Sequence, residues 1–272
     1  MENMENMKNL IEFIKTVVSH RQLIVTMARR ELKARYVGSL LGLAWNLIHP
    51  IVMISVFWFV FDIGFRSKPL NDVPFVVWLA AGMAPWFIFS EIVTNSSAAV
   101  LSNSNLIKKT LFHSQILPVV KVVTSFITHG VFLLVLFALL LVEGMAFNLF
   151  FFQFLYYLFG LVVFGMGIGW AVSALNVFVR DIAQVVAVVI QVGFWATPIF
   201  WNINIMPPKV QLVLKLNPVF YLVQGYRESF ITFIPFWHHP VLTVYFWLVA
   251  LFTFVIGALI FRRLQPQFAD VL

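Results

Sequence analysis

The chain has 272 residues, of which 61% are apolar and only 11% are charged, against roughly 45–50% and 25% in an average soluble domain. A core of this size cannot absorb so much apolar surface, so the composition excludes an ordinary soluble protein and indicates that the bilayer is the solvent. The chain has no cysteine, which excludes disulfides and thiolate metal sites, and its net charge of +7 is not arranged as the basic stripe typical of nucleic-acid binding.

Six apolar stretches approach or exceed the length of about 20 residues that a helix needs to cross the hydrocarbon core. They cover residues 37–61, 73–95, 120–142, 150–179, 182–202 and 240–261. Only Arg180 and Asp181 separate the fourth stretch from the fifth, so these two spans form a tight hairpin. We therefore expect an all-α membrane protein with a single transmembrane domain of six helices over residues 1–272.

Orientation follows from the basic residues near the span ends, which concentrate on the cytoplasmic side of membrane proteins. With a cytoplasmic N-terminus, 13 of the 18 Lys and Arg residues fall in inside segments, seven of them before the first span. The sequence therefore predicts that both termini are cytoplasmic.

Three further segments add to this plain bundle. Residues 10–27 place apolar side chains at helical spacing with basic residues elsewhere, which predicts an amphipathic helix at the cytoplasmic interface. The polar segment after the second span turns amphipathic and predicts a short cytoplasmic helix at about 104–113. Residues 203–239 contain several prolines and only short apolar stretches, which predicts short re-entrant helices on the outer side.

A search for catalytic chemistry is negative. The sequence has no phosphate-binding loop, no H-E-x-x-H and no G-x-S-x-G motif. Gly165 and Gly169 predict a small-residue face for close helix packing, as do Gly38 and Gly42. We therefore expect no catalytic residue, no metal site and no cofactor bound by this chain.

Ionisable groups within the spans are few, namely Glu91, His49 and His129. A proton-driven transporter would place such groups at mid-depth in several spans, so this scarcity disfavours secondary transport. A membrane enzyme that transfers lipid phosphates would need a cluster of acids and histidines, and the sequence offers none. The adjacent His238 and His239 are better explained as interfacial residues than as metal ligands.

Aromatic residues make up 17% of the chain and gather in the first and fifth spans. Two interpretations stay open from the residues alone: bulk that faces lipid, or a pore whose flat rings slide along sugar rings. The candidates for such a lining are Phe57, Trp58, Phe61, Phe194, Trp195, Phe200 and Trp201.

Several separated motifs resemble, in order, the permeases that export polysaccharides and polyols through ABC transporters. The motifs are RELKARYVGSLLGLAWNLIHP at 30–50, GMAPWFIFSE at 82–91, NSNLIKK at 103–109, ILP at 116–118, NP at 217–218 and YR at 226–227. The related exporters carry O-antigen, capsule or teichoic acid. The similarity runs from about Glu31 to the last span.

The resemblance implies a homodimer with two copies of a separate ATPase, which would bind the ATP and magnesium. It implies that the short helix after span two and the turn between spans four and five dock on that ATPase. The docking residues would be Asn105, Leu106, Ile107, Lys108, Lys109, Thr110 and Leu111, with Arg180 and Asp181. It also implies that spans one and five line the channel, which favours the pore interpretation of the aromatic residues.

The cargo implied by the resemblance is a polysaccharide on a polyprenyl diphosphate lipid, moved across the bacterial inner membrane. A basic cluster at the cytoplasmic entrance would suit a diphosphate, although the same residues also serve orientation. The candidates are Arg29, Arg30, Lys33 and Arg35. The alternative keeps the fold and changes the cargo to teichoic acid, capsule, or a small lipid or drug.

Overall fold

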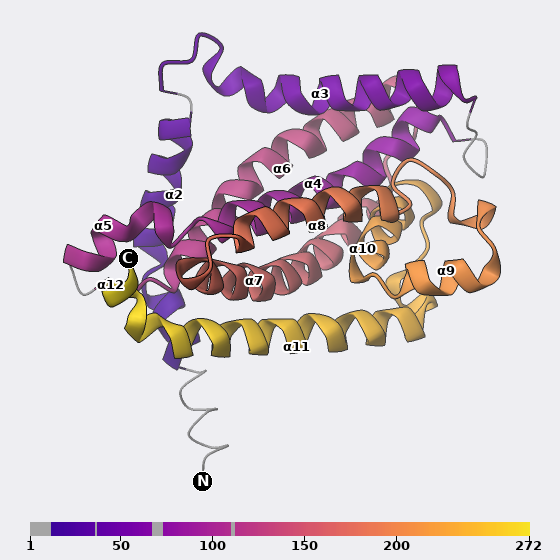
Figure 1. Ribbon diagram of the computed structural model, residues 1–272. Coiled ribbons are helices and arrows are strands. Elements are labelled where there is room, and N and C mark those ends of the chain that lie inside the picture. The colour runs from indigo at the N-terminus through magenta and orange to yellow at the C-terminus, as the bar shows by residue number, and fades with distance from the viewer. Residues whose placement is uncertain (1–11, 36, 67–72, 110–111) are drawn as a thin grey trace.

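The computed structural model describes residues 12–35, 37–66, 73–109 and 112–272. Every regular element in these ranges is a helix (Figure 1). The α-helices are α2 (Arg21–Arg35), α3 (Trp45–Trp58), α4 (Phe75–Ser97), α5 (Ser104–Lys109), α6 (Ile116–Val142), α7 (Phe154–Phe178), α8 (Ile182–Ala196), α9 (Pro208–Lys215), α10 (Pro218–Arg227), α11 (Pro240–Leu264) and α12 (Phe268–Val271). Two π-helical segments are η2 (Phe59–Gly64) and η6 (Glu228–Thr232). The short 3-10 segments are η1 (Gly42–Ala44), η3 (Leu101–Asn103), η4 (Leu149–Gln153), η5 (Ile203–Ile205), η7 (Phe236–His238) and η8 (Gln265–Gln267).

Five helical stretches in the described part of the chain are long and apolar enough to cross a membrane. They are Trp45–Gly64, Phe75–Ser97, Ile116–Val142, Leu149–Phe178 and Pro240–Val271. The predicted span 182–202 appears as the shorter apolar helix α8, which has 15 residues. The helix ends early because Pro198 disfavours helical backbone at the residue before it, and Thr197 accordingly has φ −83° and ψ 134°.

The long helices α3, α4, α6, α7, α8 and α11 run side by side, with α2, α5 and α12 at one end and α9 and α10 at the other (Figure 1). Helix α4 is the centre of the bundle and contacts α6, α7, α8 and α10. In the most apolar stretch of α4, 72% of the residues are buried, against 11% in the corresponding stretch of the span Trp45–Gly64, which includes α3. The protein therefore keeps α4 as its core and leaves α3 at the periphery.

Glycines bring α7 close to both of its neighbours. A methyl group on Gly169 would lie 2.9 Å from Ser96 Oγ, and one on Gly165 would lie 3.2 Å from Ile92, both on α4. This confirms the predicted small-residue face. On another side of α7, a methyl group on Gly167 would lie 2.5 Å from the backbone of Thr253, so α7 and α11 touch backbone to backbone.

The start of the first span differs from the expectation. Helix α3 begins at Trp45 rather than at residue 37, after a turn that contains Gly38 and Gly42. Both glycines have positive φ, +79° and +50°, and a methyl group on either would meet no atom within 4 Å. The interpretation of this pair as a helix-packing face was therefore wrong. The two glycines instead allow a turn with positive φ, a backbone conformation that residues with a side chain rarely adopt.

The predicted N-terminal helix is also divided. Residues 12–19 are helical, a turn follows at His20, and α2 then begins at Arg21. Residues 10 and 11 of the predicted helix lie outside the described residues. Helix α2 lies across the end of the bundle, crosswise to the long helices (Figure 1), and buries Ile24, Ala28 and Leu32.

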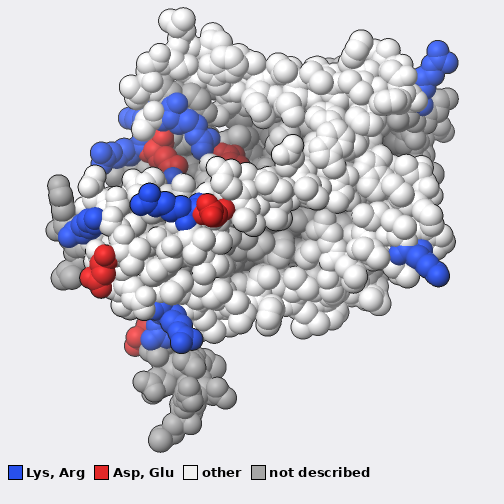
Figure 2. Space-filling model, viewed as in Figure 1, with Lys and Arg blue, Asp and Glu red and all other residues white. Residues whose placement is uncertain are grey.

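Charged side chains are concentrated at the end of the molecule that carries α2 and α5, and a broad band without charge covers the middle of the face in Figure 2. Fewer charges lie at the opposite end of this face. A bilayer requires such a band, because charges are costly within the hydrocarbon core.

Candidate functional site

The predicted coupling segment is held at both ends by helix α7. Asn176 Nδ2 donates to the carbonyl of Ser97, 2.8 Å away, where α4 ends. Trp170 Nε1 donates to the carbonyl of Gln115, 3.0 Å away, just before α6 begins. Both donors are buried, so the base of the segment is fixed while α5 extends beyond it.

Helix α5 itself is short and presents Asn105, Leu106 and Lys108 as exposed residues. Helix α12 packs against it. Of the other predicted docking residues, Ile107 is half-buried, Lys109 ends the helix, and residues 110 and 111 lie outside the described part of the chain.

The turn between α7 and α8 exposes Arg180 and Asp181. Asn176 Oδ1 accepts a hydrogen bond of 3.2 Å from the backbone N–H of Ala183, just beyond this turn. One side chain thus ties both predicted docking elements to α7. Sequence reasoning missed Asn176, although a polar residue at the end of an apolar span is a signal that could have found it.

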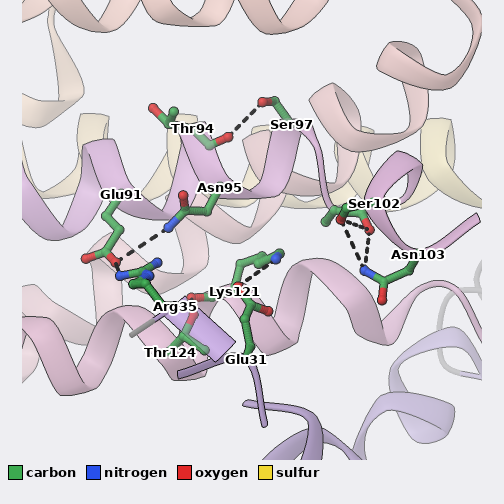
Figure 3. Close-up of polar contacts among 11 residues, drawn as sticks. Glu31, Arg35, Glu91, Thr94, Asn95, Ser97, Ser102, Asn103, Lys121 and Thr124 are labelled. Carbon is green, nitrogen blue, oxygen red and sulfur yellow. Dashed lines mark hydrogen bonds and ion pairs between the residues drawn. The ribbon is translucent and has the colours of Figure 1, made fainter. Parts of the chain in front are cut away.

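The four basic residues predicted at the lipid entrance divide into two groups. Arg29, Arg30 and Lys33 are exposed on α2. Arg35, by contrast, is paired with Glu91 of α4, with 2.9 Å between Nη1 and Oε1 (Figure 3). All four residues are therefore exposed, but Arg35 is tied to α4 through its ion pair.

A second ion pair also fixes α2. Lys121 Nζ of α6 lies 2.7 Å from Glu31 Oε1 (Figure 3). The two pairs connect α2 to α4 and α6, which places the exposed basic residues of α2 in a defined position beside the bundle.

Most of the predicted channel aromatics form one cluster between the C-terminal ends of α3 and α8. The ring centroids of Phe57 and Phe194 are 5.5 Å apart, and those of Phe61 and Phe200 are 4.8 Å apart. Trp195 completes the group at 4.9 Å from Phe200. Trp201 joins it through a hydrogen bond of 3.2 Å from Nε1 to the carbonyl of Trp195.

Trp58 lies apart from this aromatic cluster. It lines a groove between α3 and α6 with Ile54, Leu134 and Ala138. Sequence reasoning grouped Trp58 with Phe57 because the two residues are adjacent, but adjacent residues of a helix point in directions about 100° apart.

A buried arginine organises the end of the bundle that carries α9 and α10. Arg227 is 5% exposed, and its guanidinium donates to the carbonyls of Trp78, Pro198 and Ile199. The guanidinium carbon also lies 3.5 Å from the centroid of the Trp78 ring. A methyl group on Gly82 would lie 2.6 Å from Arg227 Nη2, so the space for the guanidinium exists only because residue 82 is glycine.

These contacts explain how α8 can end within the bundle. Carbonyls beyond a helix end need other donors when water is excluded, and Arg227 provides them at Pro198 and Ile199. Arg227 and Gly82 both lie in motifs noted above, but nothing in the sequence pairs two residues so far apart.

Glu228, the residue that follows Arg227, is 2% exposed. Its carboxylate accepts from Gln224 Nε2 at 3.1 Å and from Tyr157 Oη at 3.4 Å, and it lies 3.1 Å from Nε2 of His239. Sequence reasoning overlooked this partner of His239. Among the described residues, no group of three or more His, Cys, Asp or Glu is arranged to hold a metal ion.

The comparisons with known proteins agree with this architecture. The chain is 27% identical over 254 residues to the O-antigen export system permease protein RfbA of Klebsiella pneumoniae, covering 92% of this chain and 95% of that protein. It is 30% identical over 231 residues to the protein of the same name from Myxococcus xanthus, covering 81% and 85%. It is 22% identical over 209 residues to the polysialic acid transport protein KpsM of Escherichia coli, covering 74% and 78%.

The family model described as ABC-2 type transporter matches residues 22–231. This range includes α2 except for Arg21, the ion pairs that fix it, α5, the aromatic cluster and Arg227. The chain is therefore a multi-pass membrane protein that belongs to the ABC-2 type transporter family.

Proposed function

We propose that this chain is the channel-forming subunit of an ATP-driven exporter that moves polyprenyl-diphosphate-linked polysaccharide of the O-antigen type across the bacterial inner membrane. The observation that carries the proposal is the similarity, over more than four fifths of the chain, to proteins named O-antigen export system permeases. In this proposal α8 is the sixth membrane-spanning element, both termini are cytoplasmic, and two copies assemble with two copies of a separate ATPase that binds ATP and magnesium.

The coupling part of the proposal assigns α5 and the turn at Arg180 and Asp181 as the contacts with the ATPase. Both elements are exposed at the charged end of the molecule, and Asn176 connects both to α7. A push on either element would therefore act on a long helix of the bundle rather than on a loose loop.

The transport part assigns the aromatic cluster around Phe57, Phe194 and Trp195 to the channel wall. Flat apolar rings can follow a sugar chain while offering few hydrogen bonds that would trap it. Trp195 is 54% exposed and so keeps much of its surface free for a passing chain. The exposed basic residues Arg29, Arg30 and Lys33 would attract the lipid diphosphate to the cytoplasmic entrance.

The coupling assignment is tested by reversing one exposed charge on α5. We expect Lys108→Glu to lower transport-coupled ATP hydrolysis at least severalfold when the permease and its ATPase are reconstituted together in liposomes. The matched control is Lys209→Glu on α9, which makes the same charge change at the opposite end of the bundle. ATP hydrolysis by the purified chain alone, or an unchanged Lys108→Glu complex, would contradict the assignment.

The cargo assignment is tested at the aromatic cluster. We expect Trp195→Ala to reduce export of lipid-linked glycan severalfold at equal protein level, because it removes an exposed ring of the proposed channel wall. Trp237→Ala, which removes a ring that is 65% exposed at the outer end, is the control and should export normally. If Trp195→Ala changes only protein abundance, the ring is packing and the cargo assignment loses its support.

A further inference from the structure

A cavity of about 310 Å³ opens between α3, α4 and α6, where the end of α2 meets them. Most of its wall is apolar, but charged, amide, hydroxyl and imidazole groups also line it. These polar lining residues include Arg35, Asn46, His49, Glu91, Thr128 and His129. Figure 3 shows Arg35 and Glu91 pointing toward one another at this wall.

The charges in this wall are balanced. Arg35 and Glu91 form an ion pair, and Thr128 Oγ1 donates to the same carboxylate oxygen of Glu91 from 3.4 Å. The cavity therefore offers one positive and one negative group side by side, rather than the several positive groups that a polyanion would require.

One buried atom in the wall has no partner in the described part of the chain. His129 is 4% exposed, and its Nε2 lies 3.1 Å from Tyr226 Oη, whereas its Nδ1 meets no hydrogen-bond partner. Buried polar atoms are nearly always satisfied, and the imidazole that carries this atom belongs to the lining of the cavity. This observation is independent of the ion pair.

An apolar groove of about 380 Å³ lies beside this cavity, between α3 and α6. Neighbouring residues of α3 line the two spaces, with Asn46 and Pro50 in the cavity and Leu47 and Ile51 in the groove. On α6 the lining advances along the helix, from Thr128 and Phe132 in the cavity to Leu134, Val135, Ala138 and Val142 in the groove. A chamber with a few charged groups beside an apolar groove has the form of a lipid site, with the headgroup in the chamber and the tail in the groove.

We propose that the cavity and the groove together, called the seam from here on, bind a zwitterionic phospholipid with an ethanolamine headgroup. The phosphate would interact with Arg35 and His49, the ammonium would donate to Glu91, and an acyl chain would lie in the groove beside Trp58. A diphosphate carrier fits less well, because Glu91 repels its additional negative charge. A choline headgroup has no N–H to donate, and a glycerol headgroup has no cation to pair with Glu91.

This lipid site is separate from the proposed channel. It lies on the face of α3 that contacts α6, whereas the aromatic cluster lies on the face that contacts α8. The inference therefore holds or fails independently of the cargo.

Native mass spectrometry of the assembled transporter tests the site. Delipidated protein is incubated with equal amounts of phosphatidylethanolamine, phosphatidylcholine and phosphatidylglycerol. We expect the ethanolamine lipid to be retained about tenfold more than either of the others, the ratio expected for roughly one additional charge-assisted contact. Glu91→Gln should remove this preference while leaving the groove intact.

The groove is tested with two matched tryptophan substitutions on α6. Ala138→Trp places a large ring in the groove and should abolish retention of the ethanolamine lipid. Leu141→Trp adds a similar ring at an exposed position of the same helix that does not line the groove, and should retain the lipid. Both variants must first give an assembled transporter of normal size.

Three outcomes would overturn the proposal. Equal retention of the three phospholipids would show only ordinary bilayer contact, and displacement of the ethanolamine lipid by a polyprenyl diphosphate would assign the seam to the carrier. The third outcome is a second subunit, rather than a lipid, covering the groove. Because the chain has no native cysteine, Ser55→Cys tests this outcome: rapid disulfide formation between two copies through that residue would show it.

Discussion

The two ends of the bundle are held by contacts that differ in burial. At the end with α2 and α5, the ion pairs of Arg35 with Glu91 and Lys121 with Glu31 join α2 to the bundle and are partly exposed, with side-chain accessibilities between 12% and 32%. At the end with α9 and α10, Arg227 is buried and its guanidinium holds carbonyls beyond the end of α8. Water can replace a partly exposed contact at small cost, but it cannot replace a buried one.

This difference indicates which end can rearrange. Contacts worth about 1 kcal/mol or less allow α2 and its surroundings to shift during a transport cycle. The contacts of Arg227 would leave several buried carbonyls without donors if they broke, at about 1–3 kcal/mol for each group. The break after α8 is therefore a fixed point, and α2 is the adjustable element at the other end, where Asn176 and Trp170 remain buried anchors.

The largest effect is expected for Gly82→Ala, which disturbs the fixed point at Arg227. The added methyl group would lie 2.6 Å from Arg227 Nη2, which forces the guanidinium from its carbonyls. We expect a loss of about 3 kcal/mol, because overpacking and a lost charged hydrogen bond act together. Thermal unfolding in detergent measures the loss. Gly130→Ala, with no atom within 4 Å of the added methyl, is the control, and equal melting temperatures for the two variants would contradict the role of Arg227.

A smaller effect is expected at Asn176, the buried anchor at the same end of the bundle as α2. Asn176→Leu removes the hydrogen bonds to Ser97 and Ala183, at about 1–3 kcal/mol. We expect the transporter to assemble but to lose coupling, so that ATP hydrolysis no longer rises with substrate. Asn176→Asp keeps the acceptor for Ala183 and should be intermediate. Full coupling in the leucine variant would show that α7 does not hold the coupling segment.

The smallest effect is expected for the ion pair between Glu31 and Lys121. Because both side chains keep contact with solvent, a double-mutant cycle with Glu31→Gln and Lys121→Met should give a coupling energy of about 0.2–1 kcal/mol that falls with added salt. Chemical denaturation of the purified chain gives the four stabilities. A salt-independent coupling of several kcal/mol would remove the contrast between the two ends.

Features set by local composition could be predicted from the sequence. The lengths of the apolar stretches predicted the five long spans, because a segment that crosses a membrane must form its backbone hydrogen bonds within itself as a helix. Helical spacing predicted the packing face of Gly165 and Gly169, which meet Ile92 and Ser96 of α4. In each case the required information lies within one helix.

Features that depend on distant residues could not be predicted in this way. The early end of α8 is stable only because Arg227 and Gly82, from two other helices, supply donors and space. The separation of Trp58 from Phe57 depends on where α6 and α8 lie around α3. The role of Asn176 likewise appears only when the end of α4 lies beside it.

The backbone contact between Gly167 and Gly257 has a mechanical consequence. A methyl group on Gly257 would overlap the carbonyl of Gly167, so no side chain lies between α7 and α11 at this point. Side chains absorb displacement by changing rotamer, and here there are none to do so. Near the end of the bundle with α9 and α10 the same two helices are joined again, by the hydrogen bond of 2.7 Å between Trp247 Nε1 and Tyr156 Oη. A shift of α7 at the glycine contact would therefore pass to α11 directly, because no side chain between the two helices can take it up.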